Sequence, residues 1–340
     1  MIGDINLDEE FTVRLGVVGV GGQGTNLVNR LYNSGIKSAK TISLNTDAKH
    51  LNMVNAHKKI LIGKQLTRGL GAGGYPEMGM KAADVSRDEI RAAIEGLDMV
   101  FIAAGMGGGT GGGAAPIVAQ LAKEQGSLVV AFVTYPFSLE RSRKLKADWS
   151  LQQLNKNTDS TIIIENDRLL SYAPNLQIEK AFELIDNIAA NAVKGIADTI
   201  MLPSLINLDY ADLRNTLKDT GTAVINIGYG SGPDKVQRAI KSTLDHPLLN
   251  FEQEGSKGAL VHVAGSESLT IEEATTVGAG VTANLDEKAN VIFGARLSPE
   301  LGDQIKVMSI IAGVKAKLGT GIRLSESSTD TSFMQGIENL

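Results

Sequence analysis

Cysteine is absent from this sequence of 340 residues. Its absence excludes a disulfide framework, thiolate catalysis and cysteine-ligated metal ions. Aromatic residues amount to only 4% of the chain, which argues against platforms on which single-stranded bases could stack. Acidic residues outnumber basic ones, and the formal net charge is −5. A nucleic-acid partner, which would need a basic surface, is therefore not expected.

Long apolar runs are also missing, since none approaches the roughly 18 to 20 residues that span a bilayer. The acidic start, Met1–Glu10, lacks the basic flank and apolar core of a signal peptide. We therefore expect a cytoplasmic protein without direct membrane insertion. The histidines follow no ligand spacing, so no metal ion held by protein side chains is predicted; they are His50, His57, His246 and His262.

Glycine, by contrast, is abundant: 38 of 340 residues, about 11% against a typical ~7%. The excess gathers in three segments, Gly19–Gly24, Gly69–Gly74 and Gly105–Gly113. Clustered glycine indicates backbone that turns sharply or lies very close to something else.

The first half of the chain alternates short apolar runs with helical patterns, which predicts an α/β, Rossmann-like domain with a parallel sheet and helices on both faces. Expected strands cover residues 12–18, 41–44, 59–62, 97–104, 128–134 and 161–164, and expected helices cover 26–33, 89–94 and 114–123. From Gln177 to about Met201 the apolar residues keep a period of 3.6, which predicts one long helix between two domains. A smaller α/β domain follows, with strands expected at 223–227, 259–263, 290–293 and 306–311 and helices at 233–244 and 271–285.

The segment Gly105–Pro116 (GMGGGTGGGAAP) carries the clearest chemistry. It follows an apolar strand and precedes a helix, with Pro116 near the expected first turn. Glycines let successive N–H groups face an anion, and the helix N-terminus adds positive potential. Thr110 offers a hydroxyl to a phosphate or a hydrated metal ion. The alternative, a flexible linker, fits poorly between a buried strand and its helix.

The segment Gly19–Gly24 (GVGGQG) matches the dinucleotide fingerprint, and Asp47 follows at the place of a ribose-binding acid. An NAD-dependent oxidoreductase is therefore one alternative. A third segment, Gly69–Gly74 (GLGAGG), has the same character. Three such loops at the carboxyl edge of a parallel sheet favour a triphosphate gripped from several sides. No G-x-x-x-x-G-K-[ST] pattern occurs, which excludes a P-loop enzyme.

Taken together, these motifs closely resemble the tubulin/FtsZ superfamily, and the FtsZ branch more than eukaryotic tubulin. The resemblance covers about residues 11–320. Its motifs, in FtsZ order and spacing, are GVGGQGTN, NTD (Asn45–Asp47), TRGLGAGG (Thr67–Gly74), GMGGGTGGGAAP, TYPF (Thr134–Phe137), ND (Asn166–Asp167) and NLDYADL (Asn207–Leu213). It implies a tubulin/FtsZ fold divided into a short extension (1–10), a GTP-binding domain (11–175), a central helix (176–202), a C-terminal assembly domain (203–320) and a flexible tail (321–340).

The resemblance also implies a function. It implies a GTPase that binds GTP or GDP with Mg²⁺, polymerises head to tail with other copies of itself, and forms the ring at the division site. Asp209 and Asp212, on the loop after the central helix, would complete catalysis on the next subunit's nucleotide. Without the resemblance, a solvated turn would be the favoured interpretation of these two acids.

The nucleotide contacts implied by the resemblance fall into three groups: phosphates, ribose and guanine. The phosphates would be held by Gly21, Gly22, Ala72, Gly73, Gly74, Gly107, Gly108, Gly109, Thr110 and Gly111, with Asn26 reaching the phosphates and base and Asn45 and Asp47 nearby. The ribose would be lined by Thr134, Pro136 and Glu140, with either Arg143 or Lys144. Guanine would be recognised by Asn166, Phe182 and Asp186. The alternatives are a helix-surface acid for Asp186 and a core residue for Phe182.

Three positions depart from the family pattern. Gly112 replaces the usual Ser or Thr, so one hydroxyl expected near the phosphates is missing. Lys144 stands where arginine is usual, with Arg143 just before it, and Thr25 replaces glycine or another small residue. Gly112 keeps open a second alternative, a filament protein for cell shape or DNA segregation with weak hydrolysis.

The last eight residues, Phe333–Leu340 (FMQGIENL), are slightly apolar after a stretch rich in Ser, Thr and Asp. They are interpreted either as a peptide that docks on a membrane-tethering division protein or as plain disorder.

Overall fold

The computed structural model describes residues 13–168, 175, 177–201, 205–206, 209–245, 251–252 and 256–316. Several predictions concern residues outside these ranges and stay predictions. They are the extension over residues 1–10, the tail over 321–340 with its peptide Phe333–Leu340, and the place of His246.

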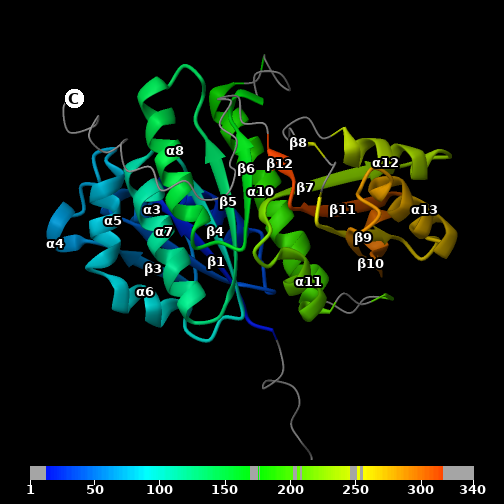
Figure 1. Cartoon of the computed structure of the whole chain (residues 1–340), viewed down its shortest axis with the longest axis horizontal. Coiled ribbons are helices and arrows are strands. Elements are labelled where there is room, and N and C mark those ends of the chain that lie inside the picture. Colours follow the sequence, from blue (N-terminus) through cyan, green and yellow to red (C-terminus); the bar gives the residue numbers. More distant parts are fainter. Residues whose placement is uncertain are drawn as a thin grey trace, which may run out of the picture.

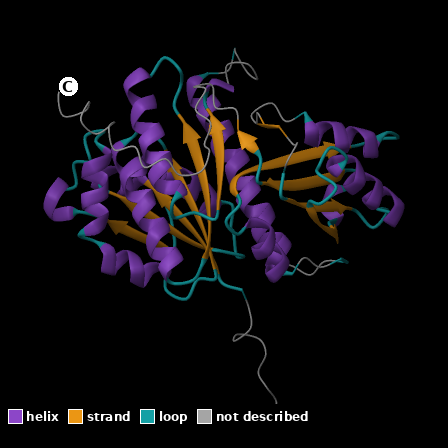
Figure 2. Ribbon diagram, viewed as in Figure 1, coloured by secondary structure: helices purple, strands orange, loops and turns teal. Residues whose placement is uncertain are grey.

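Ten strands form one sheet in the order β10-β9-β11-β7-β6-β5-β4-β1-β2-β3 (Figures 1 and 2). The first six are all parallel: β1 (Leu15–Val20), β2 (Lys40–Asn45), β3 (Lys58–Leu61), β4 (Met99–Gly105), β5 (Leu128–Tyr135) and β6 (Ser160–Glu165). The predicted parallel sheet is confirmed. Strand ends differ from the expected ones by up to three residues, because an apolar run does not mark where pairing with its neighbours stops.

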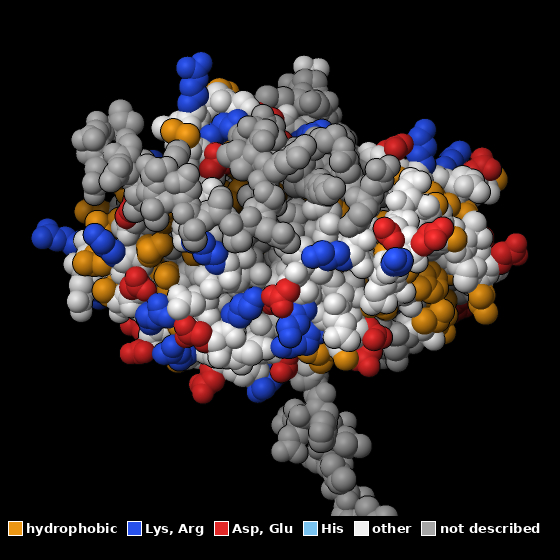
Figure 3. Space-filling view, viewed as in Figure 1, with side chains coloured by type: hydrophobic (Ala, Val, Ile, Leu, Met, Phe, Trp, Pro, Cys, Tyr) orange, Lys and Arg blue, Asp and Glu red, His pale blue; other side chains and the backbone are white. Residues whose placement is uncertain are grey.

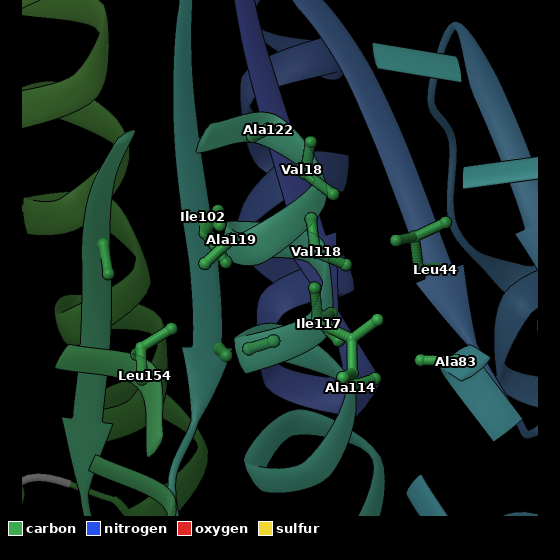
Figure 4. Close-up of a cluster of buried hydrophobic side chains, with 14 of the residues drawn as sticks. Val18, Leu44, Ala83, Ile102, Ala114, Ile117, Val118, Ala119, Ala122 and Leu154 are labelled. Atoms are coloured by element: carbon green, nitrogen blue, oxygen red, sulfur yellow. The ribbon is translucent and has the colours of Figure 1, made fainter. Parts of the chain in front are cut away.

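Helices cover both faces of this parallel sheet. On one face, α2 (Gly21–Asn33) and α10 (Ile178–Met201) pack on a core that includes Val17, Phe101 and Phe132. On the other, α5 (Pro76–Asp84), α6 (Arg87–Ile94), α7 (Gly109–Glu124) and α8 (Arg141–Asn155) pack on a second core. In Figure 4, Val118 and Ala119 of α7 lie against strand residues such as Val18 and Ile102. Small alanines bring α7 close to the sheet.

The second half continues the same sheet, with mixed strand directions. Its strands are β7 (Gly221–Gly230), β9 (Gly258–Gly265), β10 (Asn290–Leu297) and β11 (Ile305–Ala312), and β11 is antiparallel to both β7 and β9. The helices α12 (Lys235–Leu244) and α13 (Ile271–Thr282) cover one face, and α10 lies toward the other. The predicted long helix is confirmed: α10 has 24 residues, about 36 Å at 1.5 Å per residue. Minor elements are β8 (Phe251–Glu252), β12 (Lys315–Ala316) and a 3-10 turn, η1 (Pro299–Leu301).

Several helices were not predicted. They are α3 (Ala48–Met53), α4 (Lys64–Thr67), α5, α8 and α11 (Tyr210–Leu217). The helices α3 and α4 are too short to show a period. In α8 the buried positions are few, and its first turns are basic and exposed. Tertiary packing and caps, rather than an amphipathic pattern, define these helices.

The expected extent of the long glycine loop was wrong. Strand β4 ends at Gly105 and helix α7 begins at Gly109, so only residues 106–108 are loop, and Pro116 lies well inside the helix instead of near its first turn. Glycine is a poor helix former, but these glycines allow α7 to meet α5 backbone to backbone. A Cβ on Gly113 would overlap the carbonyl oxygen of Pro76, and one on Gly79 would overlap that of Gly109.

Charged side chains of both signs are intermixed on the face shown in Figure 3, which carries no continuous basic band. None of the helices in the described part of the chain is both long enough and apolar enough to cross a bilayer.

The close approach of α5 and α7 makes a direct prediction about stability. Replacing Gly113 by Ala should lower the free energy of unfolding by about 1–3 kcal/mol or more, because the added methyl group overlaps the Pro76 carbonyl. The matched control is Gly22→Ala, which adds the same group to a helix where the nearest outside atom is 4.0 Å away. Thermal unfolding of both variants without nucleotide tests this. Equal melting temperatures would contradict the packing role of Gly113.

Candidate nucleotide-binding site

The three glycine segments meet at the carboxyl edge of the parallel sheet, as the sequence predicted. A Cβ on Gly21 would lie 2.8 Å from the Gly111 nitrogen, so the Gly19–Gly24 and Gly105–Gly113 segments touch through their backbones. A Cβ on Gly109 would lie 2.9 Å from Ala72 Cβ, so the Gly69–Gly74 segment adjoins Gly105–Gly113. Residues distant in sequence therefore build one glycine-walled site above β1 and β4.

Two helices begin at this site without a side-chain cap. Val20 precedes α2 and Gly108 precedes α7, and neither supplies a capping hydrogen bond. The first turn of each helix also lacks an acidic residue. The first N–H groups of both helices thus remain available, and both helix ends carry partial positive charge. This combination suits an anion such as a chain of phosphates.

Glycines of the Gly69–Gly74 segment adopt backbone conformations with positive φ, which other residues rarely adopt. Gly71, Gly73 and Gly74 have φ of +89°, +62° and +77°. Lys146 Nζ donates to the Gly74 carbonyl at 2.7 Å and lies 4.9 Å from the centroid of the Tyr75 ring. Lys146 therefore fixes this loop.

Polar side chains beneath the glycines hold one another in place. The Thr110 and Thr46 hydroxyls are hydrogen-bonded at 2.7 Å, and both residues are buried. Asn45 Oδ1 accepts from the Asp47 N–H, and Asp47 in turn caps α3 by accepting from the His50 N–H at 3.0 Å. The Asp47 carboxylate is thus engaged in a helix cap, which weakens its interpretation as a ribose-binding acid of a dinucleotide enzyme.

Thr46 and Gln23 are two residues that the sequence reasoning missed. Gln23 Oε1 accepts from the Thr134 hydroxyl at 2.8 Å, while its buried Nε2 has no hydrogen-bond partner. Asn166 is buried as well, and its Oδ1 has no partner. Buried polar atoms are normally satisfied, so an orphaned donor and an orphaned acceptor fit a missing polar ligand. The sequence feature that could have identified Gln23 is that it has the one long side chain in GVGGQG.

Asp186 and Phe182 project from α10 on the side of this site. Asp186 is 6% exposed, and Arg30 Nε lies 3.5 Å from its carboxylate. Burial raises the pKa of Asp186 to about 6, although the Arg30 guanidinium opposes the shift. Phe182 is 38% exposed and meets the Phe137 ring edge-on at 6.1 Å. Asp186 is therefore not a helix-surface acid, and Phe182 is not a core residue.

The expected ribose side is organised around Glu140. Its Oε2 pairs with Arg143 Nη1 at 2.6 Å, and its Oε1 accepts from the Phe137 N–H. Lys144 instead places its Nζ 5.9 Å from the centroid of the Tyr135 ring. Arg143 is thus the basic residue coupled to Glu140. Of the other predicted contacts, Gly22 and Asn26 are exposed and Pro136 is buried.

Asp209 directly precedes helix α11, and Asp212 lies in its first turn rather than on a loop as expected. Asp209 caps α11 by accepting from the Ala211 N–H at 3.0 Å, and Asp212 is exposed in the first turn. The Tyr210 hydroxyl donates to the Asp98 carbonyl at 2.6 Å. Asp98 directly precedes β4, so α11 lies at the amino edge of the sheet (Figure 1). The seven residues of β4, at about 3.3 Å each, separate it from the glycine loops by roughly 20 Å.

Gly112 points elsewhere than the sequence suggested. A Cβ on Gly112 would start against the Ser150 side chain of α8, with Pro76 Cγ at 3.8 Å. The Ser150 hydroxyl is buried and has no hydrogen-bond partner. Thr25, the other small-residue departure, is accommodated within α2, where its hydroxyl donates to the Gly21 carbonyl at 2.8 Å. Among the described residues, no three His, Asp or Glu side chains gather as a metal-binding group.

Comparison with known proteins identifies two family domains. The Tubulin/FtsZ family, GTPase domain, matches residues 14–174, and the FtsZ family, C-terminal domain, matches residues 221–315. Cell division protein FtsZ 2 of Methanocaldococcus jannaschii is 50% identical over 312 residues, which cover 91% of this chain and 82% of that protein. Cell division protein FtsZ 1 of Thermococcus kodakarensis is 48% identical over 320 residues, or 94% and 86%.

Solved structures agree with these matches. An empty FtsZ dimer from M. jannaschii superposes with a TM-score of 0.85 at 41% identity, and the match covers 95% of this chain and 96% of that one. The tubulin/FtsZ fold is thereby confirmed, and GTP or GDP binding is a property of the family. With an N-terminal GTPase domain followed by the family's own C-terminal domain, this chain belongs to the FtsZ family of tubulin-like GTPases.

Proposed function

We propose that this chain hydrolyses GTP in head-to-tail protofilaments and forms the cytoskeletal ring at the division site in the cytoplasm. One observation carries this proposal: the glycine-walled site and the acids of α11 occupy opposite edges of the sheet. One chain cannot bring them together. Two chains stacked edge to edge in a line would do so at every junction.

Nucleotide binding rests on residues of one chain. The free N–H groups at the starts of α2 and α7 hold the phosphates, and the Thr110 hydroxyl lies beside them. Asp186 accepts hydrogen bonds from the N1–H and the 2-amino group of guanine, a donor pair that adenine lacks. Asn166 and Gln23 supply the orphaned acceptor and donor described above. Glu140, held by Arg143, faces the ribose.

Hydrolysis rests on the next chain along the filament. Asp209 and Asp212 orient the attacking water toward the γ-phosphate, a task suited to carboxylates. Mg²⁺, when bound, would neutralise charge on the phosphates. The dimeric form of the M. jannaschii FtsZ structure supports self-association.

Two alternatives remain distinct from this proposal. A cell-shape or DNA-segregation filament with weak hydrolysis is motivated by Gly112, and an NAD-dependent oxidoreductase by GVGGQG. The oxidoreductase alternative leaves the site built from three glycine segments unexplained. Its ribose-binding acid would be Asp47, whose carboxylate instead caps α3. The tail peptide Phe333–Leu340 remains a proposed contact with a membrane-tethering division protein, and its deletion should abolish recruitment to membrane-bound partners.

Asp212→Asn should reduce GTP turnover by at least about 100-fold, the usual contribution of a positioned acid or base, with GTP affinity unchanged. The control Glu272→Gln removes an exposed carboxylate from α13 and should leave turnover unchanged. Phosphate release and light scattering with GTP and Mg²⁺ measure both steps.

Mixing two variants separates a shared site from a site within one chain. Asp186→Ala should fail to hold guanine but still supply Asp209 and Asp212. Mixed with Asp212→Asn, which holds GTP, it should restore turnover well above the sum of the two separate proteins. A merely additive mixture, or loss of GTP binding in Asp212→Asn, would refute the shared site.

The raised pKa of Asp186 predicts a pH-dependent choice of base. Below about pH 6 the carboxyl is protonated and no longer accepts both guanine donors. GTP affinity should therefore fall relative to inosine triphosphate, which has the same phosphates but no 2-amino group. Binding titrations from pH 5 to 7.5 measure the ratio, and Asp186→Asn should flatten it. A pH-independent ratio in the wild type would contradict this role.

The same shift has a consequence for stability without nucleotide. The folded chain binds the proton more tightly than the unfolded one, whose pKa is near 3.8. Folding is therefore disfavoured progressively as the pH rises from about 4 to about 6, by up to about 3 kcal/mol. Asp186→Asn should remove this part of the pH dependence in urea unfolding.

Gly112 can be tested together with Ser150. Gly112→Thr alone should destabilise the protein, because its Cβ overlaps the Ser150 hydroxyl. Gly112→Thr combined with Ser150→Ala should recover the melting temperature. We expect GTP turnover of this double variant to stay within about twofold of the wild type, a difference below 1 kcal/mol in the activation barrier. Ser150→Ala alone is the control. A tenfold rise would favour the weak-hydrolysis alternative.

A further inference from the structure

A second hollow lies between α10 and the C-terminal part of the sheet, away from the glycine loops. Its volume is about 180 Å³. Lys194 and Asp198 line it from α10, and the opposite wall carries His262 of β9, Arg296 of β10, Lys306 of β11 and Glu300 of η1. No step of the proposed GTPase uses any of these residues.

Strand register creates the space. Arg296, Ala264 and Lys306 stand directly side by side on three adjacent strands, so their side chains share one face. His262 precedes Ala264 by two residues and occupies the same face. The alanine methyl group is far shorter than the cationic chains on either side of it. A cavity therefore opens between two positive charges.

The cations of this hollow are only partly balanced by carboxylates. Within the described ranges, no carboxylate oxygen lies within 4.0 Å of Lys194, Arg296 or Lys306. Asp198 instead accepts a hydrogen bond from the Ser38 hydroxyl at 3.0 Å, and Glu300 is exposed. Burial, together with the neighbouring Arg296, lowers the pKa of Lys306, and Asp198 and Glu300 oppose this shift only in part. The lining thus carries three cations against two carboxylates, which leaves an excess of positive charge.

Two buried polar atoms in the same wall lack partners. His262 is 5% exposed, and its Nε2 makes no hydrogen bond. The Nε atom of Arg296 is also buried and makes no hydrogen bond. Burial, with Arg296 and Lys306 adding to it, lowers the pKa of His262 to about 4, so the ring is neutral at pH 7. Leaving such groups unpaired costs free energy that a ligand with several oxygens would recover.

We propose that this hollow binds a small oxyanion of the phosphate type, held by Arg296 and Lys306 with His262 Nε2 as a third contact. Guanidinium and ammonium groups together are well suited to a compact, multiply charged group of oxygens. The volume equals roughly six waters at about 30 Å³ each. It admits inorganic phosphate or a small phosphorylated metabolite. Lys194 of α10 lines the same hollow, so such an anion lies between α10 and the sheet.

Inorganic phosphate is the probe for this site. Titration calorimetry and thermal unfolding are measured in phosphate against sodium chloride of equal ionic strength, with saturating GDP to occupy the glycine loops. The wild type should bind one phosphate and melt at a higher temperature. Arg296→Gln and Lys306→Gln should each weaken binding at least about tenfold, the worth of one charge-assisted hydrogen bond. Lys306→Arg should retain it, and glyceryl phosphate in place of phosphate tests for an organic ligand.

The matched control is Lys241→Gln, which removes an exposed charge from α12 and should bind phosphate like the wild type. Absence of binding in the wild type would overturn the proposal. So would binding that is equal in Arg296→Gln and Lys241→Gln, because phosphate would then occupy another place. The comparison between these variants does not depend on GTP hydrolysis, so failure of the proposed GTPase leaves the result interpretable.

Discussion

Backbone contact between α7, α5 and the Gly19–Gly24 segment is the constraint on which the rest of the structure depends. Glycines at 79, 109, 111 and 113 let these segments approach to distances that a methyl group would prevent. The same approach leaves two helix N-termini side by side without caps. One feature therefore packs the core of the first domain and creates the positive potential for phosphates. A substitution at one of these glycines would damage folding and phosphate binding together. The two roles can be separated only by substituting residues that serve one of them.

The polarity of the sheet then determines what one chain can do alone. All strands from β1 to β6 are parallel, so every loop after a strand lies at one edge and every loop before a strand at the other. Tyr210 and Arg214 attach α11 to the second edge through the carbonyls of Asp98 and Gly126. A parallel sheet with unlike chemistry at its two edges has a direction. Stacking such units in line is the simplest arrangement that joins the halves, and an open filament results from a heterologous contact of this kind.

Much of this could be predicted from the sequence. The strand–helix alternation, the long helix α10 and the convergence of the glycine segments all follow from local pattern and from the geometry of parallel sheets. The helical state of Gly109–Pro116 could not, because propensity opposes it and only contact with α5 explains it. Nor could the direction of position 112, the burial of Asp186 or the orphaned amide of Gln23, which depend on neighbours distant in the chain. The motifs identified the participants, and tertiary contacts decided the direction of each side chain.

Helix α10 connects the electrostatics of the two halves. Near its start Asp186 is buried with Arg30 as its counter-charge, and burial still raises its pKa. Further along, Lys194 faces Arg296 and Lys306 across the second hollow. A packed apolar core alone would favour neither a buried carboxylate at Asp186 nor the cations around the second hollow. Buried charges that are only partly compensated are costly in a structural element, and they are typical of sites completed by a ligand. Helix α10 is therefore more than a spacer between domains, because each of its halves presents an incompletely satisfied charge to a separate proposed binding site.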